Sequence, residues 1–165
     1  MKKIVTLCLV EKDEQVLLGM KKRGFGEGLY NGFGGKVDTY ETIEGAAARE
    51  LFEEAGVTAL TLEKIGILEF SFAEEPTLEL VMHIFKTNNF SGAPIESPEM
   101  KPRWFSINAI PYSHMWTSDI VWFPLFLSGQ KFTGKFRFDK PGGSTHTAHI
   151  LEQILTPVES LKDSV

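Results

Sequence analysis

The pattern of apolar and polar residues predicts two β-hairpins in the first half of the chain. Residues 4–10 (IVTLCLV) are rich in β-branched and apolar side chains and end at a polar cluster, and residues 16–20 form a second such run. Residues 60–72 and 78–86 are two further strand-like runs, separated by the polar break Glu74-Glu75-Pro76. Each pair of runs is close enough in sequence to form a hairpin.

Between the two hairpins the chain predicts a helix over residues 43–55. Thr42 is suited to cap its N-terminus, and Gly56 is suited to end it in the left-handed conformation. The preceding segment 21–36 (KKRGFGEGLYNGFGGK) is too rich in glycine for regular structure. A glycine-rich, basic segment is typical either of a flexible loop or of backbone that closely approaches a phosphate.

The second half mixes loop, helix and strand signals. We expect a loop over residues 91–102 and a short helix over residues 116–127, capped by Thr117 or Ser118. The apolar side chains expected to face inward from this helix are Trp122, Phe123 and Leu127.

Phenylalanines alternate with polar residues over 131–139, which predicts a strand. After the break Pro141-Gly142-Gly143-Ser144, residues 146–155 fit a strand or a helix, and residues 156–165 are expected to fray. With no repeat or linker, the whole of 1–165 is interpreted as one domain of the α+β class.

Composition limits the function. The net charge of −5 argues against a protein that clamps a nucleic-acid polymer, because that task needs a basic surface. The one cysteine, Cys8, excludes an internal disulfide and fits a reducing compartment. The apolar run near the N-terminus is too short to span a membrane. We therefore expect a cytoplasmic, non-membrane protein, with the mitochondrial matrix and the nucleus as alternatives.

The helix over residues 43–55 carries an unusual cluster of acids. Glu50, Glu53 and Glu54 fall at i, i+3 and i+4 and share one face, where like charges repel by roughly a few tenths of a kcal/mol per pair. One interpretation is a solvated acidic face. The other is a binding site for a hard divalent cation such as Mg²⁺, which takes oxygen ligands and bridges carboxylates to phosphates.

The spacing of the surrounding residues favours the second interpretation. Gly35, five residues, Glu41, seven residues and then the run 49–57 (RELFEEAGV) reproduce the fixed positions of the Nudix box. The chain therefore resembles the Nudix hydrolases, which cleave nucleoside diphosphates linked to another moiety. This resemblance implies a mixed β-sheet sandwiched between α-helices and a Mg²⁺ cofactor, for which Mn²⁺ is a substitute.

Segments outside the box resemble the animal MutT homologues, which hydrolyse oxidised purine nucleoside triphosphates such as 8-oxo-dGTP. These segments are VLLGMKKRGFGEGLYNGFGGKV, ESPEMKPRWF and MW followed by WFPL. The resemblance implies attack of a metal-activated water on the α-phosphorus, releasing the nucleoside monophosphate and pyrophosphate. The substrate is then a small-molecule nucleoside triphosphate, and we expect a monomer.

The same resemblance assigns residues to roles. Gly34, through its carbonyl, and Glu50, Glu53, Glu54 and Glu99 would hold Mg²⁺, with Arg49 orienting the glutamates. The catalytic set is Arg49, Glu53, Glu54 and Glu99, and the general base is left open between Glu53 and Glu99. The substrate-binding set is Thr6, Lys21, Phe25, Asn31, Phe33, Gly34, Gly35, Lys36, Phe70, Phe72, Trp116, Ser118 and Asp119.

Two departures from these homologues stand out, and the first bears on specificity. Ser118-Asp119 stands where they have two adjacent aspartates, which are thought to read the base edge of 8-oxo-guanine and 2-hydroxy-adenine. A serine carries no titrating charge, so we expect guanine recognition to persist and dual specificity to change. Tyr40 replaces a common glycine.

Two other functions stay open. The first is a Nudix hydrolase with another main substrate, such as a different modified purine triphosphate, ADP-ribose or a dinucleoside polyphosphate. The second is a non-catalytic Nudix-fold nucleotide binder, against which the intact box argues.

Overall fold

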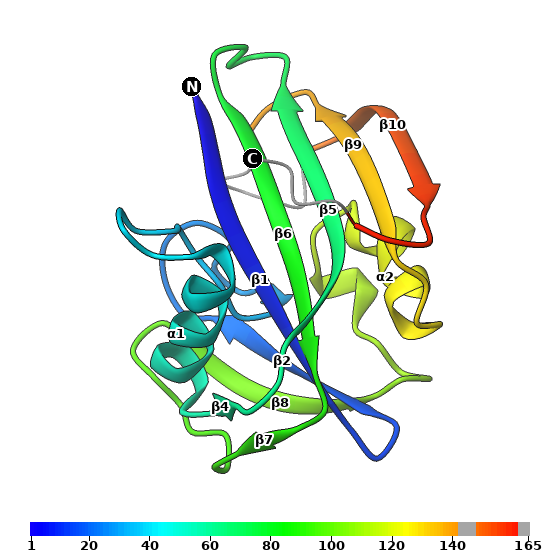
Figure 1. The fold of residues 1–165 in the computed structure, drawn as a ribbon. Coiled ribbons are helices and arrows are strands. Elements are labelled where there is room, and N and C mark those ends of the chain that lie inside the picture. Colours follow the sequence, from blue (N-terminus) through cyan, green and yellow to red (C-terminus); the bar gives the residue numbers. More distant parts are fainter. Residues whose placement is uncertain (142–147, 162–165) are drawn as a thin grey trace.

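The protein is a mixed β-sheet flanked by two α-helices. A computed structural model describes residues 1–141 and 148–161 (Figure 1). The strands are β1 (Lys2–Lys12), β2 (Gln15–Lys21), β3 (Tyr30–Asn31), β4 (Thr58–Ala59), β5 (Glu63–Phe72), β6 (Glu79–Thr87), β7 (Phe90–Ser91), β8 (Met100–Ser106), β9 (Phe132–Phe138) and β10 (Ile150–Pro157). The helices are α1 (Ile43–Ala55), α2 (Asp119–Leu127) and a 3₁₀ turn at Tyr112–His114.

Eight strands form the main sheet. Their order is β10-β9-β5-β6-β1-β2-β3, with β8 also paired to β2. β1 runs parallel to β6 and β5 parallel to β9, whereas the other pairs are antiparallel. Both predicted hairpins are confirmed, β1 with β2 and β5 with β6. β4 and β7 form a separate two-stranded sheet.

The sheet separates two hydrophobic cores. Successive side chains of a strand point to opposite faces, so Leu7 and Leu9 of β1 pack with α2 while Cys8 and Val10 pack with α1. Trp122, one of the residues of α2 in the larger core, is fully buried. Both sides of the sheet are thus covered, which confirms an α+β sandwich of a mixed sheet between helices (Figure 1).

Helix α1 has the predicted bounds and caps. The Thr42 hydroxyl accepts a hydrogen bond from the Gly45 N–H, and Gly56 ends the helix with φ of 70°. Leu51 and Ala55 are fully buried against the sheet. Local signals were sufficient here because caps and apolar spacing agree.

Helix α2 differs from the prediction over residues 116–127. It begins only at Asp119, and Ser118 occupies the N-cap without a side-chain capping bond. Phe126 faces the core, whereas Leu127 is only half-buried. The apolar content of this segment was high on every face, so its inward side was not defined by periodicity.

Two boundaries near the sheet edges were also wrong. The predicted loop 91–102 ends at residue 99 because β8 begins at Met100. Pro102 is tolerated in β8 because, in the described part of the chain, this strand pairs with β2 alone. In the segment 146–155, which fits a strand or a helix by sequence, the structure has a strand: β10 begins at Ile150. β10 continues through Thr156 and Pro157, so the expectation that these two residues fray is wrong. Residues 142–147 and 162–165, which carry most of the predicted break and the chain end, lie outside the described residues.

Among the described residues, no helix is both long enough and apolar enough to cross a membrane.

Candidate active site

The glycine-rich segment replaces β2 as the neighbour of one half of β1. β2 pairs with β1 only from Val10 onward, and residues 33–37 fill the space beside the earlier part of β1. The Thr6 N–H donates to the Gly35 carbonyl at 2.9 Å, and a Cβ on Gly34 would lie 1.8 Å from the Thr6 carbonyl oxygen. Only glycine permits this close approach of the two backbones.

Glu54 connects helix α1 to this glycine segment. Its Oε1 accepts a hydrogen bond from the Gly34 N–H at 2.8 Å, and its side chain is buried. Burial raises the pKa of Glu54 to about 7; the Gly34 N–H opposes the rise, and the Glu50 charge adds to it. A bound cation would stabilise the ionised form of this carboxylate.

Arg49 organises the other acids of the box. Its Nε donates to Glu41 Oε2 at 2.6 Å and its Nη2 to Glu41 Oε1 at 2.9 Å. Its Nη1 donates to both Glu50 Oε1 and Glu53 Oε2 at 3.1 Å. The paired hydrogen bonds with Arg49 lower the pKa of Glu41 to about 2. Glu41 therefore holds the guanidinium of Arg49 in place, and Arg49 in turn orients Glu50 and Glu53, two of the predicted metal ligands.

Glu99 lies in the loop before β8 and has basic partners. Its Oε2 accepts from Lys21 Nζ at 3.2 Å, and its Oε1 accepts from Arg23 Nε at 3.0 Å and Nη2 at 2.8 Å. These hydrogen bonds lower the pKa of Glu99. Its charge also contributes to the raised pKa of Glu54, so the two carboxylates are within electrostatic range of each other.

The donor chemistry fits a hard divalent cation. Glu50, Glu54 and the Gly34–Gly35 backbone meet at one end of the glycine segment, where a Cβ on Gly35 would lie 2.6 Å from Glu50 Oε1. All of these ligands are oxygens, as Mg²⁺ and Mn²⁺ prefer. Within residues 1–141 and 148–161, however, no three acidic, histidine or cysteine side chains already converge as a cation site. The basic partners of Glu53 and Glu99 hold these two carboxylates instead.

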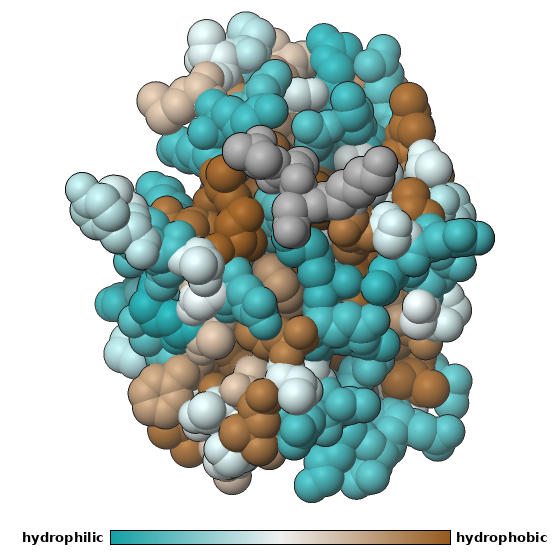
Figure 2. All heavy atoms as spheres, viewed as in Figure 1, coloured by the Kyte–Doolittle hydropathy of each residue, from teal (hydrophilic) through white to brown (hydrophobic). Residues whose placement is uncertain are grey.

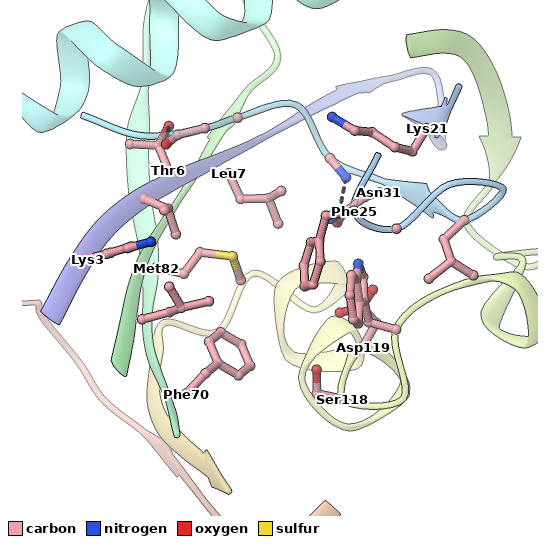
Figure 3. Close-up of a pocket in the computed structure, with 18 of the residues that line it drawn as sticks. Lys3, Thr6, Leu7, Lys21, Phe25, Asn31, Phe70, Met82, Ser118 and Asp119 are labelled. Atoms are coloured by element: carbon pink, nitrogen blue, oxygen red, sulfur yellow. Dashed lines mark hydrogen bonds between the residues drawn. The ribbon is translucent and has the colours of Figure 1, made fainter. Parts of the chain in front are cut away.

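A cavity of about 540 Å³ extends from Glu54 along the α2 face of the sheet (Figure 3). One wall consists of Phe25 and Trp116, whose ring centroids are 4.9 Å apart. Phe70 and Phe72 of β5 also line the cavity, and both stack on Phe138. Five aromatic rings, those of Phe25, Phe70, Phe72, Trp116 and Phe138, thus line the cavity and suit a flat ligand.

Asp119 lines this cavity at the first residue of α2. Its Oδ1 accepts a hydrogen bond from Trp122 Nε1 at 3.1 Å, whereas its buried Oδ2 has no hydrogen-bond partner among the described residues. Burial raises the pKa of Asp119 to about 7, against the hydrogen bond from Trp122. Ser118, also buried, lies beside it on the cavity wall. The unsatisfied Oδ2 is available to a polar ligand.

The cavity brings together residues that are far apart in sequence. The predicted substrate-binding residues that line it are Thr6, Lys21, Phe25, Asn31, Gly34, Gly35, Lys36, Phe70, Phe72, Trp116, Ser118 and Asp119, and Glu54 lines it as well. Phe33 is the exception. It is fully buried in the α1-side core with Cys8, Leu51 and Met100, so it supports the site from behind instead of lining it.

Several lining residues were missed by sequence reasoning. They are Lys3, Val5, Leu7, Gly26, Leu29, Gly32, Leu78, Leu80, Met82, Met100, Phe138, Lys140 and Ala148. The two-residue period of the strands could have found part of this set, because Lys3, Val5 and Leu7 share one face of β1. No sequence signal marked Lys140 or Ala148, which follow β9.

Comparisons with known proteins agree with this geometry. A family model described as NUDIX domain matches residues 1–126. The chain is 53% identical over 152 residues to a zebrafish (Danio rerio) protein named oxidized purine nucleoside triphosphate hydrolase, covering 92% of this chain and 96% of that one. It is 50% identical over 136 residues to the mouse (Mus musculus) protein of that name, covering 82% and 86%.

The fold has solved counterparts too. A crystal structure of a mutator MutT protein from Bacillus halodurans matches with a TM-score of 0.80 at 28% identity, covering 93% of this chain and 97% of that one. Hydrolases with a NUDIX domain generally depend on a divalent metal. Because the family model spans most of the chain and includes the Gly35–Val57 box and its glutamates, this protein belongs to the Nudix family of hydrolases.

Proposed function

We propose that this chain is a Mg²⁺-dependent pyrophosphohydrolase that converts oxidised purine nucleoside triphosphates of the 8-oxo-dGTP class to the monophosphate and pyrophosphate. The observation that carries the proposal is that one cavity joins the box carboxylate Glu54 to the unsatisfied carboxyl of Asp119. Proteins of 53% and 50% identity named oxidized purine nucleoside triphosphate hydrolase support it.

The base is bound at the Asp119 end of the cavity. Phe25 and Trp116 offer aromatic faces to a purine ring, while Asp119 Oδ2 and the Ser118 hydroxyl offer hydrogen bonds to its edge. Asn31, from β3, adds an amide that both donates and accepts. A site that pairs its buried polar groups with a particular base edge rejects bases that leave those groups unpaired.

The triphosphate is bound at the opposite end. Lys21 and Lys36 line this part of the cavity and supply positive charge, and the close backbone of Gly34 and Gly35 lets phosphate oxygens approach without a Cβ in the way. Thr6 also lines the cavity and lies next to Gly35, whose carbonyl accepts a hydrogen bond from the Thr6 N–H.

Mg²⁺, or Mn²⁺ as a substitute, would be held by the Gly34 carbonyl and by Glu50, Glu53, Glu54 and Glu99. When bound, the cation neutralises phosphate charge and lowers the pKa of the attacking water. Arg49 keeps Glu50 and Glu53 oriented through its shared Nη1. The proton of the attacking water goes to a carboxylate oxygen of Glu53 or Glu99, and Lys21 and Lys36 stabilise charge on the phosphates.

A substrate panel with chromatographic detection of the nucleoside monophosphate and the other product tests the proposal. The panel contains 8-oxo-dGTP, dGTP, 2-hydroxy-dATP, ADP-ribose and a dinucleoside polyphosphate, each with Mg²⁺ and with Mg²⁺ removed by chelation. We expect 8-oxo-dGTP to be hydrolysed far faster than dGTP and only with metal. Equal rates on the two guanine nucleotides would refute the oxidised-base preference, and turnover of another panel member alone would identify the second candidate.

We further infer that the protein acts as a cytoplasmic monomer. Cys8 is buried and its burial raises the pKa of the thiol to about 12, so this thiol is protected from disulfide exchange and reactive only when the chain opens. Sedimentation equilibrium over a range of protein concentrations tests the monomer, and imaging of a tagged protein tests the compartment.

A further inference from the structure

Two loops are joined by ion pairs at the rim of the cavity. One loop follows β2 and carries Lys22 and Arg23, and the other precedes β8 and carries Glu96 and Glu99. Lys22 Nζ donates to the Ser97 carbonyl at 3.0 Å and pairs with Glu96 at 3.1 Å. Arg23 instead binds Glu99 through two nitrogens. Lys22 and Arg23 thus bind the same loop before β8, but Lys22 contacts Glu96 and Ser97 whereas Arg23 contacts Glu99.

The two oxygens of Glu99 have partners on different sides. Oε2 binds Lys21, which lines the cavity and extends along its edge (Figure 3). Oε1 binds Arg23, whose side chain is 66% exposed, compared with 27% for Lys21. Oε2 therefore belongs to the cavity side of the carboxylate and Oε1 to the solvent side.

We propose that Arg23 is a positioning residue that keeps Glu99 aimed into the active site. The inference rests on the proposed function only for the role of Glu99 as a metal ligand or base. When a cation displaces the Lys21 ammonium, or a triphosphate attracts it, Oε2 loses its partner and becomes available to the cation or to the attacking water. Arg23 retains Oε1, so the carboxylate cannot turn away into solvent.

The geometry of arginine suits this task. Its planar fork presents two donors to a single carboxylate oxygen, which fixes direction as well as distance. On the helix side of the site Arg49 orients Glu50 and Glu53 in another way, through a single nitrogen, Nη1, that donates to both carboxylates. The loop glutamate is thereby oriented by its own arginine, and Lys22 provides a natural control because it tethers the loop without touching Glu99.

Three variants separate positioning from tethering: Arg23→Ala, Arg23→Lys and Lys22→Ala. The first readout is Mn²⁺ binding to the full chain without nucleotide. Binding is measured from the electron paramagnetic resonance signal of the free ion. The second is kcat and KM. We expect Arg23→Ala to weaken Mn²⁺ binding or lower kcat about tenfold, the usual cost of losing a group that orients a ligand, with KM little changed. Arg23→Lys should recover part of the loss, and Lys22→Ala should change either quantity less than about twofold.

A double-mutant cycle with Glu99→Gln completes the test. In the Glu99→Gln background, Arg23→Ala should have no further effect, because its action passes through Glu99. Equal losses in Arg23→Ala and Lys22→Ala, or a full Arg23→Ala effect that persists without Glu99, would overturn the proposal. Kinetics use whichever panel nucleotide is turned over, and the Mn²⁺ titration uses none. A missing preference for 8-oxo-dGTP would therefore refute the substrate assignment and leave this test intact.

Discussion

The Gly34 N–H donates a hydrogen bond to Glu54 Oε1 at 2.8 Å, so the helix and the glycine segment of the box meet at one buried carboxylate. Glu54→Gln removes the charge but leaves an oxygen that can accept this bond. We expect turnover to fall about 100-fold or more with little change in Tm. Glu44→Gln, an exposed acid in the first turn of the same helix, is the matched control and should keep full activity. Unchanged turnover in Glu54→Gln would exclude Glu54 from the metal site.

Gly34 also packs its Cα against β1. In Gly34→Ala the new Cβ would overlap the Thr6 carbonyl oxygen, and neither backbone can move without breaking the bonds beside it. We expect a loss of about 3 kcal/mol in the free energy of unfolding, at the upper end of overpacking. Gly24→Ala is the control, since φ is 77° there but the space is open, and it should cost about 1 kcal/mol. Similar losses by urea denaturation in the two variants would contradict this explanation.

Tyr40 has a φ of 70° and is fully exposed in the loop that leads into α1. This loop projects from the left edge of the molecule in Figures 1 and 2. Glycine would adopt this conformation without the strain that a Cβ causes. Tyr40→Gly removes left-handed strain of about 1–2 kcal/mol, and the greater flexibility of glycine in the unfolded chain offsets part of this gain. We therefore expect a net stabilisation of roughly 0.5–1 kcal/mol. Tyr40→Ala keeps the strain, so its Tm should not rise, and a rise would argue against strain as the cause.

Asp119 makes stability depend on pH. Its pKa is raised from 3.8 to about 7, so between these values the folded chain keeps a proton that the unfolded chain has released. The folded state therefore binds more protons, and stability falls as the pH rises through this window, by up to about 1.4 kcal/mol per unit. Asp119→Asn can still accept from Trp122 and lacks this titration. The free energy of unfolding of the wild type relative to Asp119→Asn, measured by urea denaturation, should fall between about pH 4 and pH 7. If the two proteins show the same dependence of this free energy on pH, Asp119 is not a buried, protonated carboxyl.

Ser118 is buried on the cavity wall beside Asp119 and does not cap α2. Ser118→Asp would add a second carboxyl to the base edge, so we expect the rate on 2-hydroxy-dATP relative to 8-oxo-dGTP to rise about tenfold, the equivalent of one hydrogen bond to a charged group. Ile120→Asp adds the same charge on the exposed side of the helix start and should leave the ratio unchanged. An unaltered ratio in Ser118→Asp would remove Ser118 from base recognition.

Much of the local structure could be predicted because its causes are local. The bounds of α1 follow from Thr42, Gly56 and a 3.6-residue apolar stripe, all within one short segment. The alternation of β9 predicted its buried side correctly. Local signals did not predict the start and the buried face of α2 correctly, because its apolar residues surround the helix and define no single buried face.

Local sequence patterns were enough to predict α1, the two hairpins and β9, together with the acidic box and the family to which the box belongs. The meeting of Thr6, Asn31 and Asp119 in one cavity, which the family resemblance implied, has its physical cause in tertiary structure: β1 pairs in parallel with β6, and α2 packs across the sheet. The tertiary structure also places Phe33 in the core. The glycine segment has no regular alternation of side chains, so the direction of the Phe33 side chain is fixed only by the backbone hydrogen bonds between Phe33 and Cys8. The partners of Glu99 were likewise undetermined, as they are more than seventy residues away along the chain.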